Sequence, residues 1–303
     1  MSIFPTRILL ATDGSRDAEL ATRTASMLAS STGSELHVAH VGPTTLIPYD
    51  PSMPEGTEPA RAEREAEKLL SEQVERIEAA GGSIAQSHLR MGGAAEEIVA
   101  LGEEIEAGLI VVGSRGRGSL RRALMGSVSD SVVRHAHCPV LVVRGEEGEE
   151  PLVSSERILL ATDGSEEAEL AAATAADLAK STGSVLDVVH ALGVEPWRFP
   201  PDEHGNKRLE ELKGQGRRLL DEQVEKVGAS GGSVGTSHLA VGRPADEIVA
   251  YAEDQGAGLI VVGSRGREGI RRALVGSVSD AVVRHAHCPV LVVRSERERT
   301  RER

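Results

Sequence analysis

The chain has 303 residues, which is enough for two units that each bury a core of ordinary domain size. Its formal net charge of −13 argues against wrapping a nucleic-acid backbone, because that role needs a basic surface. Hydrophobic residues make up 40% of the chain and aromatic residues only 2%, so we expect cores of aliphatic strands and alanine-rich helices.

The N-terminal residues lead almost directly into an apolar run, and they lack the basic start and cleavable apolar segment of a signal peptide. No apolar run approaches the roughly 18 residues that suggest a membrane span. Cys138 and Cys288 are the only cysteines, so neither a disulfide framework nor a zinc site of paired cysteines is expected. We therefore expect a cytoplasmic protein with no membrane and no nucleic-acid partner.

Short aliphatic runs alternate with segments of helical periodicity in the first half of the chain. The predicted strands are 7–12, 35–41, 83–89, 109–113 and 139–144. The predicted helices are 16–32, 60–80, 94–107 and 127–136. Alternation of this kind predicts right-handed crossovers and a mostly parallel α/β sheet covered by helices on both faces.

This pattern occurs twice in the chain. The segment ILLATDGS at 8–15 recurs at 158–165, and RHAHCPVLVVR at 134–144 recurs at 284–294. A repeat of this length is a whole domain, since solenoid units have periods of about 20–50 residues. We predict a first domain at 1–145, a linker at 146–156, a second domain at 157–295 and a charged, disordered tail at 296–303.

Two proline-rich segments, 43–59 and 193–207, differ strongly between the copies. We interpret them as surface loops after the second strand of each copy. They are either tolerated excursions or segments that fold over a ligand.

A glycine-rich turn follows the fourth predicted strand, where Gly113, Gly116, Gly126 and Ser127 are matched in the second copy. Glycine permits positive φ and close approach of backbone N–H groups to a ligand, and a helix that starts at the serine adds further donors. Neighbouring arginines concentrate positive charge there, namely Arg115, Arg117, Arg121 and Arg122, and Arg265, Arg267, Arg271 and Arg272. The pattern predicts a phosphate site; the alternative is a sharp turn with a solvated basic face.

Asp13 and Asp163 each follow the first strand of their copy. A carboxylate there can accept hydrogen bonds from a ribose hydroxyl. The alternative role is to cap the next helix, which the following Ser15 or Ser165 could also do. With a strand order of 3-2-1-4-5, Asp13 and Gly113 would face each other across the crevice where the connections diverge.

These residues resemble those of the universal stress proteins, specifically the ATP-binding subclass in its tandem two-domain form. The resemblance covers both copies except the proline-rich loops and the tail, and its specific motif is Gly-x-x-Gly-x9-Gly-(Ser/Thr). It implies two doubly wound, Rossmann-like domains, each with a five-stranded parallel sheet of order 3-2-1-4-5. It also implies an internal pseudo-dimer through the fifth strands, and it leaves a further homodimer open.

The resemblance implies one adenine-nucleotide site per domain, for ATP, with ADP, AMP and an accompanying Mg²⁺ left open. The residue that closes the second strand, Val41 or Ala191, is expected to contact the adenine. The first candidate site comprises Ala11, Thr12, Asp13, Val41, Gly113, Ser114, Arg115, Gly116, Arg117, Gly126, Ser127 and Val128. The second comprises Ala161, Thr162, Asp163, Ala191, Gly263, Ser264, Arg265, Gly266, Arg267, Gly276, Ser277 and Val278.

The copies differ near these sites. Gly118 is replaced by Glu268, which places an acid beside the expected phosphate position and predicts a weaker second site. Gly93 and Ala94 are replaced by Arg243 and Pro244, which either restore positive charge or begin a helix.

The sequence HAHC at 135–138 and 285–288 is too compact for a usual tetrahedral metal site. We expect a packed cysteine and exposed histidines there, and no metal.

Neither a Walker lysine nor a nucleophile elbow is present. We therefore favour a nucleotide-dependent stress-response regulator or sensor without an assigned catalytic residue. A slow ATP hydrolase or phosphotransferase is one alternative, and an interaction module without a ligand is another.

Overall fold

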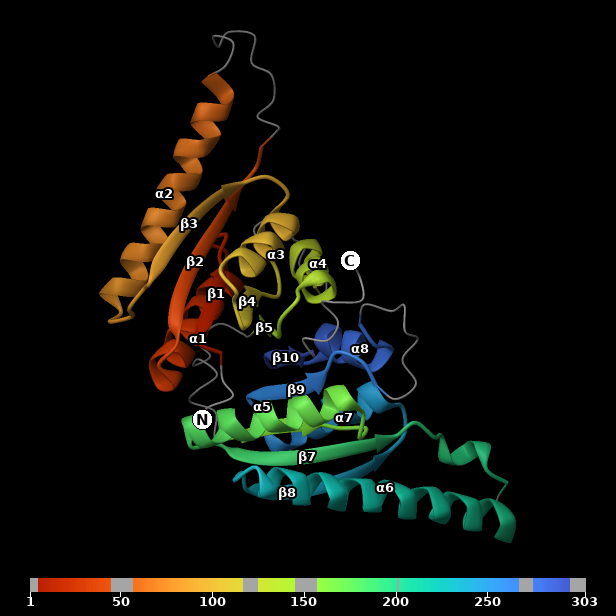
Figure 1. Cartoon of the computed structure of the whole chain (residues 1–303). Helices are drawn as coiled ribbons and strands as arrows, with labels where there is room; N and C mark the ends of the chain where they lie inside the picture. The colour runs from red at the N-terminus through yellow and green to blue at the C-terminus, as the bar shows by residue number, and fades with distance from the viewer. Residues whose placement is uncertain are drawn as a thin grey trace. The chain divides into compact units, whose positions relative to one another are not determined.

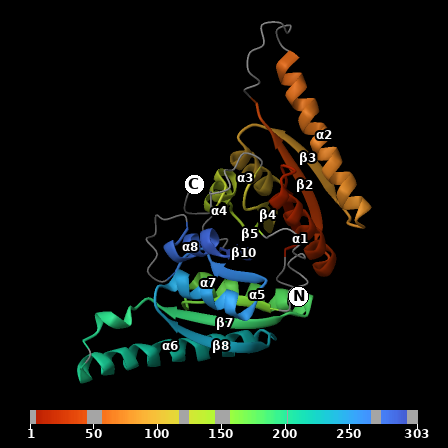
Figure 2. The same ribbon diagram turned by 180° about the vertical axis from the view of Figure 1, so that it is seen from behind.

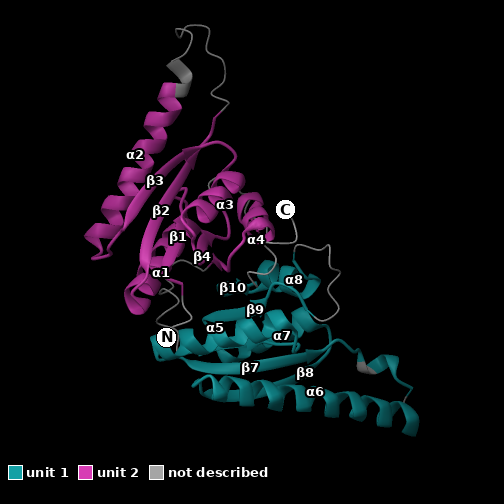
Figure 3. Ribbon diagram, in the orientation of Figure 1, with its two compact units in different colours: residues 1–4, 152–303 teal, residues 5–151 magenta. Residues whose placement is uncertain are grey.

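The computed structural model describes residues 5–44, 57–116, 125–144, 157–200, 202–266 and 275–294 (Figure 1). The chain divides into two compact units, residues 5–151 and residues 152–303 together with 1–4 (Figure 3). We call them the first and the second domain. The expected linker and tail lie outside the described residues, so the domain boundaries stay predictions.

The described part of the first domain alternates strands and helices. Its strands are β1 (Arg7–Ala11), β2 (Glu35–Gly42), β3 (Gln86–Met91), β4 (Leu109–Gly113) and β5 (Val140–Val143). Its helices are α1 (Arg16–Thr32), α2 (Thr57–Ala79), α3 (Ala94–Glu104) and α4 (Ser127–His135). Helices α1 and α2 cover one face of the sheet, and α3 and α4 cover the other (Figures 1 and 2).

The second domain repeats this order. Its strands are β6 (Arg157–Ala161), β7 (Val185–Leu192), β8 (Val234–Val241), β9 (Leu259–Gly263) and β10 (Val290–Val293). Its helices are α5 (Glu166–Thr182), the short η2 (Pro196–Arg198), α6 (Glu203–Ala229), α7 (Pro244–Gln255) and α8 (Ser277–His285).

Each domain has one parallel sheet. The strands of the first domain lie in the order β3-β2-β1-β4-β5, and those of the second in the order β8-β7-β6-β9-β10. Numbered within each copy, both orders are 3-2-1-4-5. The predicted doubly wound α/β fold is therefore confirmed for both domains, while the pseudo-dimer through the fifth strands stays a prediction.

The central strands are buried on both faces. Ile8, Leu9 and Leu10 of β1 have no exposed surface, and neither do Ile110 and Val111 of β4. Continuous apolar strands are typical of parallel sheets, because helices cover both faces. Within the described part of the chain, no helix combines the length and the apolar character needed to cross a membrane.

Helix α1 packs on the sheet through small side chains. Ala21 and Ala25 are completely buried, as are Ala171 and Ala175 at the matching positions of α5. The helix ends at Gly33, whose φ of 71° is the left-handed conformation that glycine adopts readily. A close approach between α1 and the sheet follows, and it determines the geometry of the candidate site.

Three predictions about loops and strands were wrong in detail. The third strand lies at 86–91 instead of 83–89, because its pairing with β2 continues until Met91 is opposite Gly42. The predicted loop at 193–207 contains the start of α6, since the Asp202 side chain accepts a hydrogen bond from Gly205 N at 2.8 Å and caps that helix. Helix α2 likewise starts at Thr57 within the predicted loop 43–59, of which 45–56 lies outside the described residues.

Candidate functional site

The carboxyl ends of β1 and β4 lie side by side at one edge of the first domain's sheet. Their register pairs Ala11 with Val112, so the connection after β1 lies beside the turn after β4. Ser15 Oγ donates a hydrogen bond to Arg115 O at 3.1 Å and links the two connections directly. The predicted halves of the site are therefore adjacent.

The same link is present in the second domain. Ala161 pairs with Val262, and Ser165 Oγ donates to Arg265 O at 3.3 Å. The connections after β6 and β9 are therefore joined by the same serine bond as their counterparts after β1 and β4.

Asp13 lies against the glycine turn, and it is not the cap of α1. Its Oδ1 accepts a hydrogen bond from Ser15 N at 2.9 Å. A Cβ on Gly116 would lie only 2.7 Å from Asp13 Oδ2, so the carboxylate faces Gly116 and not Gly113 as predicted. Ser15 caps the helix, because its Oγ accepts from Ala18 N at 3.4 Å.

Asp163 repeats these contacts. Its Oδ1 accepts from Ser165 N at 3.0 Å, and its Oδ2 faces Gly266. Ser165 Oγ accepts from Ala168 N at 3.2 Å and caps α5. In both copies the serine supplies the cap, which leaves the aspartate beside the turn.

The described motif glycines lie close to neighbouring atoms, and none of them uses the positive φ that glycine permits. Among the described residues, the glycines with positive φ lie at other positions, such as Gly14 and Gly164. A Cβ on Gly113 would lie 2.8 Å from Ala18 N, inside the backbone of α1. Gly126 has an extended conformation (φ −76°, ψ 153°) that any residue adopts, and its Cβ would keep 3.3 Å from Ser114 O.

The start of α4 is fastened to the turn. Gly126 N donates to Ser114 O at 2.8 Å, and Ser129 Oγ donates to the same oxygen at 2.9 Å. Ser127 is exposed, and Val128 keeps 38% of its surface exposed. The first turn of a nine-residue helix therefore lies beside Ser114 with its two leading side chains toward solvent.

The second domain fastens α8 in a similar way. Gly276 N donates to Ser264 O at 2.7 Å, and Ser279 Oγ donates to Gly263 O at 2.6 Å. We did not predict Ser129 and Ser279 as site residues. Their signal was their place three residues after the N-cap glycine, on the face of a short helix that turns inward.

Another residue that the sequence did not reveal as a site residue is Asp17, in the first turn of α1. It is 4% exposed. Its Oδ2 accepts hydrogen bonds from Ser114 Oγ at 2.6 Å and from Arg115 Nε at 3.0 Å. A buried carboxylate thus lies beneath the Gly-Ser-Arg-Gly turn of the first domain.

The second domain has Glu167 at this position. Within the described residues, the Glu167 side chain forms no hydrogen bond and no ion pair, and the buried hydroxyl of Ser264 has no hydrogen-bond partner. The signal for this difference was the contrast between RDAEL and EEAEL after the shared ATDGS.

The residues expected to contact the adenine lie near the carboxyl ends of β2 and β7, at the same edge of each sheet as the glycine turn. Val41 and Ala191 are half-buried, and each is followed by one more strand residue, so neither closes its strand as predicted. Their neighbours His40 and His190 hold the end of the first strand, through contacts of Nδ1 at 2.8 Å with Thr12 O and Thr162 O.

The remaining predicted residues fall into two groups. Ala11, Ala161, Thr12 and Thr162 are buried, and the threonine hydroxyls accept from Gly14 N at 3.3 Å and Gly164 N at 3.2 Å. The positions outside the described residues are Arg117, Gly118, Arg121, Arg122, Arg267, Glu268, Arg271 and Arg272. The predicted basic cluster is thus represented by Arg115 and Arg265.

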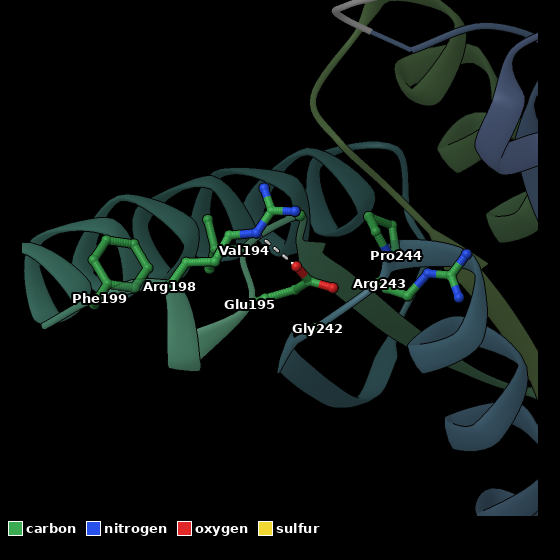
Figure 4. Close-up of a pocket in the computed structure, with 8 residues that line it drawn as sticks. Val194, Glu195, Arg198, Phe199, Gly242, Arg243 and Pro244 are labelled. Carbon is green, nitrogen blue, oxygen red and sulfur yellow. Dashed lines mark ion pairs between the residues drawn. The ribbon is translucent and has the colours of Figure 1, made fainter. Parts of the chain in front are cut away.

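A hollow of about 320 Å³ lies in the second domain, at the carboxyl ends of β7 and β8 (Figure 4). Its lining residues are Gly193, Val194, Glu195, Arg198, Phe199, Gly242, Arg243 and Pro244. Arg198 Nε pairs with Glu195 Oε2 at 2.7 Å, and Arg243 pairs with Asp246 at 3.4 Å. Pro244 is the first residue of α7, so the Arg-Pro substitution begins a helix and also lines this hollow.

The two HAHC segments combine a buried cysteine with histidines of differing exposure. Cys138 and Cys288 are buried free thiols. His135, His285 and His287 are exposed as expected, whereas the side chain of His137 is only 4% exposed. The described residues contain no group of three or more side chains placed to hold a metal ion.

Comparison with known proteins gives a consistent result. A family model described as the universal stress protein family matches residues 5–144 and 154–294. Universal stress protein Rv2005c of Mycobacterium tuberculosis (strain ATCC 25618 / H37Rv) is 39% identical over 197 residues, covering 62% of this chain. The match also spans only 62% of that relative's length.

Two further relatives match almost end to end. A universal stress protein of Mycolicibacterium smegmatis is 31% identical over 292 residues, covering 95% of this chain and 96% of that one. The crystal structure of a universal stress protein from Archaeoglobus fulgidus DSM 4304 has a TM-score of 0.69 at 27% identity, covering 95% of this chain and 96% of that chain.

Proposed function

The chain belongs to the universal stress protein family, and on that premise we propose that each domain binds an adenine nucleotide, with ATP as the principal ligand. The bound nucleotide would bias the conformation or the partner choice of a cytoplasmic stress-response regulator. The observation that carries this proposal is the placement of Asp13 against Gly116, beside the start of α4.

This placement suits the parts of a nucleotide. Backbone N–H groups in the first turn of a helix have no intrahelical partner and favour an anion, so the start of α4 would hold phosphate oxygens. Arg115 adds a positive charge at the same turn, with its side chain 37% exposed. Asp13 would accept from the ribose hydroxyls, and Val41 at the same edge would contact the base.

The hydrogen bonds that the carboxylates at the turn accept from the protein favour a role as a regulator. In the first domain, Asp13 accepts from Ser15 N, and Asp17 accepts from Ser114 and Arg115. Both carboxylates thus hold the turn in place, and no contact among the described residues assigns either of them the role of a general base. Slow hydrolysis of ATP is therefore an outcome to test and not part of the proposal.

The test compares the wild type with the double variant Gly126→Val, Gly276→Val. The extended backbone at both positions suits valine, but its Cβ would lie 3.3 Å from Ser114 O and 3.4 Å from Ser264 O, so the turn must shift slightly to admit it. Circular dichroism checks that the double variant is folded, and ATP binding should be lost because valine occupies the space in front of the helix start. Gly228→Val is the matched control, because a Cβ there meets nothing within 4 Å. Binding of ATP with Mg²⁺ is measured by calorimetry, and phosphate release is measured alongside.

Near-stoichiometric ATP in the wild type and the control, with none in a folded double variant, would support the proposal. Full affinity in the folded double variant would reject the assigned sites. No nucleotide binding by the wild type would leave an interaction module without a ligand as the better account.

A further inference from the structure

The geometry points to Asp17 as a positioning residue that orders the first domain's turn before the nucleotide arrives, whereas Glu167 leaves the second turn less ordered and its site weaker. This inference rests on the proposed function, because it ranks the two sites of one protein. It derives from the replacement of Asp17 by Glu167, which lies outside the glycine motif that the two domains share.

Three hydrogen bonds hold the first turn to the start of α1. Two run from Ser114 Oγ and Arg115 Nε to Asp17 Oδ2, and the third runs from Ser15 Oγ to Arg115 O. The Asp17 side chain is 5% exposed, so water competes little for these bonds. Charge-assisted bonds to a buried carboxylate are stronger than neutral ones, and the position in the first helical turn further favours a negative charge.

The second turn keeps only the bond from Ser165 Oγ to Arg265 O among these three. Ser264 has no exposed surface, and its hydroxyl has no hydrogen-bond partner among the described residues. The strand end packs directly on the helix here, since a Cβ on Gly263 would lie 2.9 Å from the carbonyl carbon of Glu167. At this spacing a short aspartate reaches the turn in the first domain, and the longer glutamate makes no such bond in the second.

Ordering before binding lowers the cost of binding. A site whose backbone is already held in place loses less conformational entropy when the ligand arrives. The phosphate-binding groups of the first domain would thus be preorganised, and those of the second would have to be ordered by the nucleotide itself. The two sites of one chain would fill in sequence as the nucleotide concentration rises.

The test replaces each acid by the one found in the other domain, Asp17→Glu and Glu167→Asp. It uses variants in which only one nucleotide site is left intact. Gly276→Val leaves the first site, and Gly126→Val leaves the second, with dissociation constants for ATP and Mg²⁺ measured by calorimetry. We expect the first site to be tighter. Asp17→Glu should weaken the first site about tenfold, the size expected for losing a charged hydrogen bond, and Glu167→Asp should tighten the second. A gain of affinity in Glu167→Asp is the deciding readout, because loss of a merely structural contact cannot produce it.

Hydrogen exchange of the ligand-free protein tests the positioning itself. The backbone amides of residues 113–116 should exchange hydrogen more slowly than those of residues 263–266. The substitutions Asp17→Glu and Glu167→Asp together should reverse this difference. Equal hydrogen-exchange rates in the two turns, or an unchanged affinity for ATP in both Asp17→Glu and Glu167→Asp, would overturn the inference. If the wild type binds no nucleotide, the proposed function fails and the ranking of affinities fails with it, while slower exchange in the first turn would still support the positioning role of Asp17.

Discussion

The turns after β4 and after β9 share the sequence Gly-Ser-Arg-Gly, yet the side chains beneath them differ. Asp17 accepts two hydrogen bonds from the first turn, while Glu167 accepts none from the described residues around the second. The N-cap serine of the first helix, Ser15 of α1 or Ser165 of α5, donates a hydrogen bond to the turn in both domains. Identical motifs therefore do not make identical sites, because part of their support comes from a neighbouring helix.

A second difference lies between the second and third strands of each sheet. In the first domain, His37 Nδ1 lies 3.0 Å from His88 Nε2, and the rings stack with centroids 5.3 Å apart. In the second, Asp187 takes the place of His37 and pairs with Arg157 at 2.7 Å, while His238 stacks on Tyr251. The same fold thus accommodates an imidazole pair in one copy and an ion pair in the other.

The largest difference between the domains should follow removal of the two acids. Asp17→Ala should destabilise the first domain by about 2–3 kcal/mol, because the Ser114 hydroxyl loses a buried charged partner. Glu167→Ala should change the stability of the second domain by less than about 0.5 kcal/mol, as at a site without specific bonds. Urea unfolding followed by peptide-resolved hydrogen exchange would measure both, and equal losses would contradict the comparison.

An effect common to both domains is expected at the strand ends. Gly113→Ala and Gly263→Ala should each cost about 1–3 kcal/mol, because the added Cβ meets helix backbone that cannot move aside. The same unfolding measurement checks this, with Gly228→Ala as the control in open space. Loss of nucleotide binding without loss of stability would mean that these glycines serve the ligand instead of the packing.

A smaller common effect is expected at the helix caps. Ser15→Ala and Ser165→Ala should each destabilise their domain by about 1 kcal/mol, the usual cost of removing an N-cap side chain. Thermal unfolding by calorimetry would compare them. A clearly larger loss in the second domain would show that its turn relies more heavily on the bond from Ser165 Oγ to Arg265 O.

The smallest effect concerns pH. Burial lowers the pKa of His37, opposed by Glu35 and aided by Arg7, and burial together with His37 and Arg90 lowers the pKa of His88, opposed by Glu104. The unfolded chain then binds more protons than the folded one, so the stability of the first domain falls as the pH drops below the ordinary histidine value of about 6.5.

Hydrogen exchange at pH 7.5 and 5.5 checks this expectation. Peptides of β2 and β3 should exchange faster at the lower pH, after correction for the intrinsic rate, than peptides of β7 and β8. His37→Gln should remove part of the difference. Equal loosening of both strand pairs would show that the imidazole pair is not the cause.

Much of this protein was readable from local sequence. The periodicity of apolar residues located the helices α1 and α4 and the strand β4 at or within a residue of their observed bounds, because periodicity reflects which face of an element is buried. The repeat and the glycine pattern carried the resemblance to the family, which implied the strand order, and ATDGS contained the helix cap at Ser15.

Only the tertiary structure decided which distant residues support the turn. Asp17 and Ser114 are 97 positions apart, and the contrast between RDAEL and EEAEL indicates that the copies differ at this position but not which residue Asp17 contacts. The sequence also did not show why each glycine is needed. Gly113 is needed because a side chain there would meet the backbone of α1, whereas the backbone conformation of Gly126 does not require glycine. Sequence patterns describe how one element meets its surroundings, whereas packing between elements determines which side chains meet; one methylene group between Asp17 and Glu167 is enough to separate two otherwise matching sites.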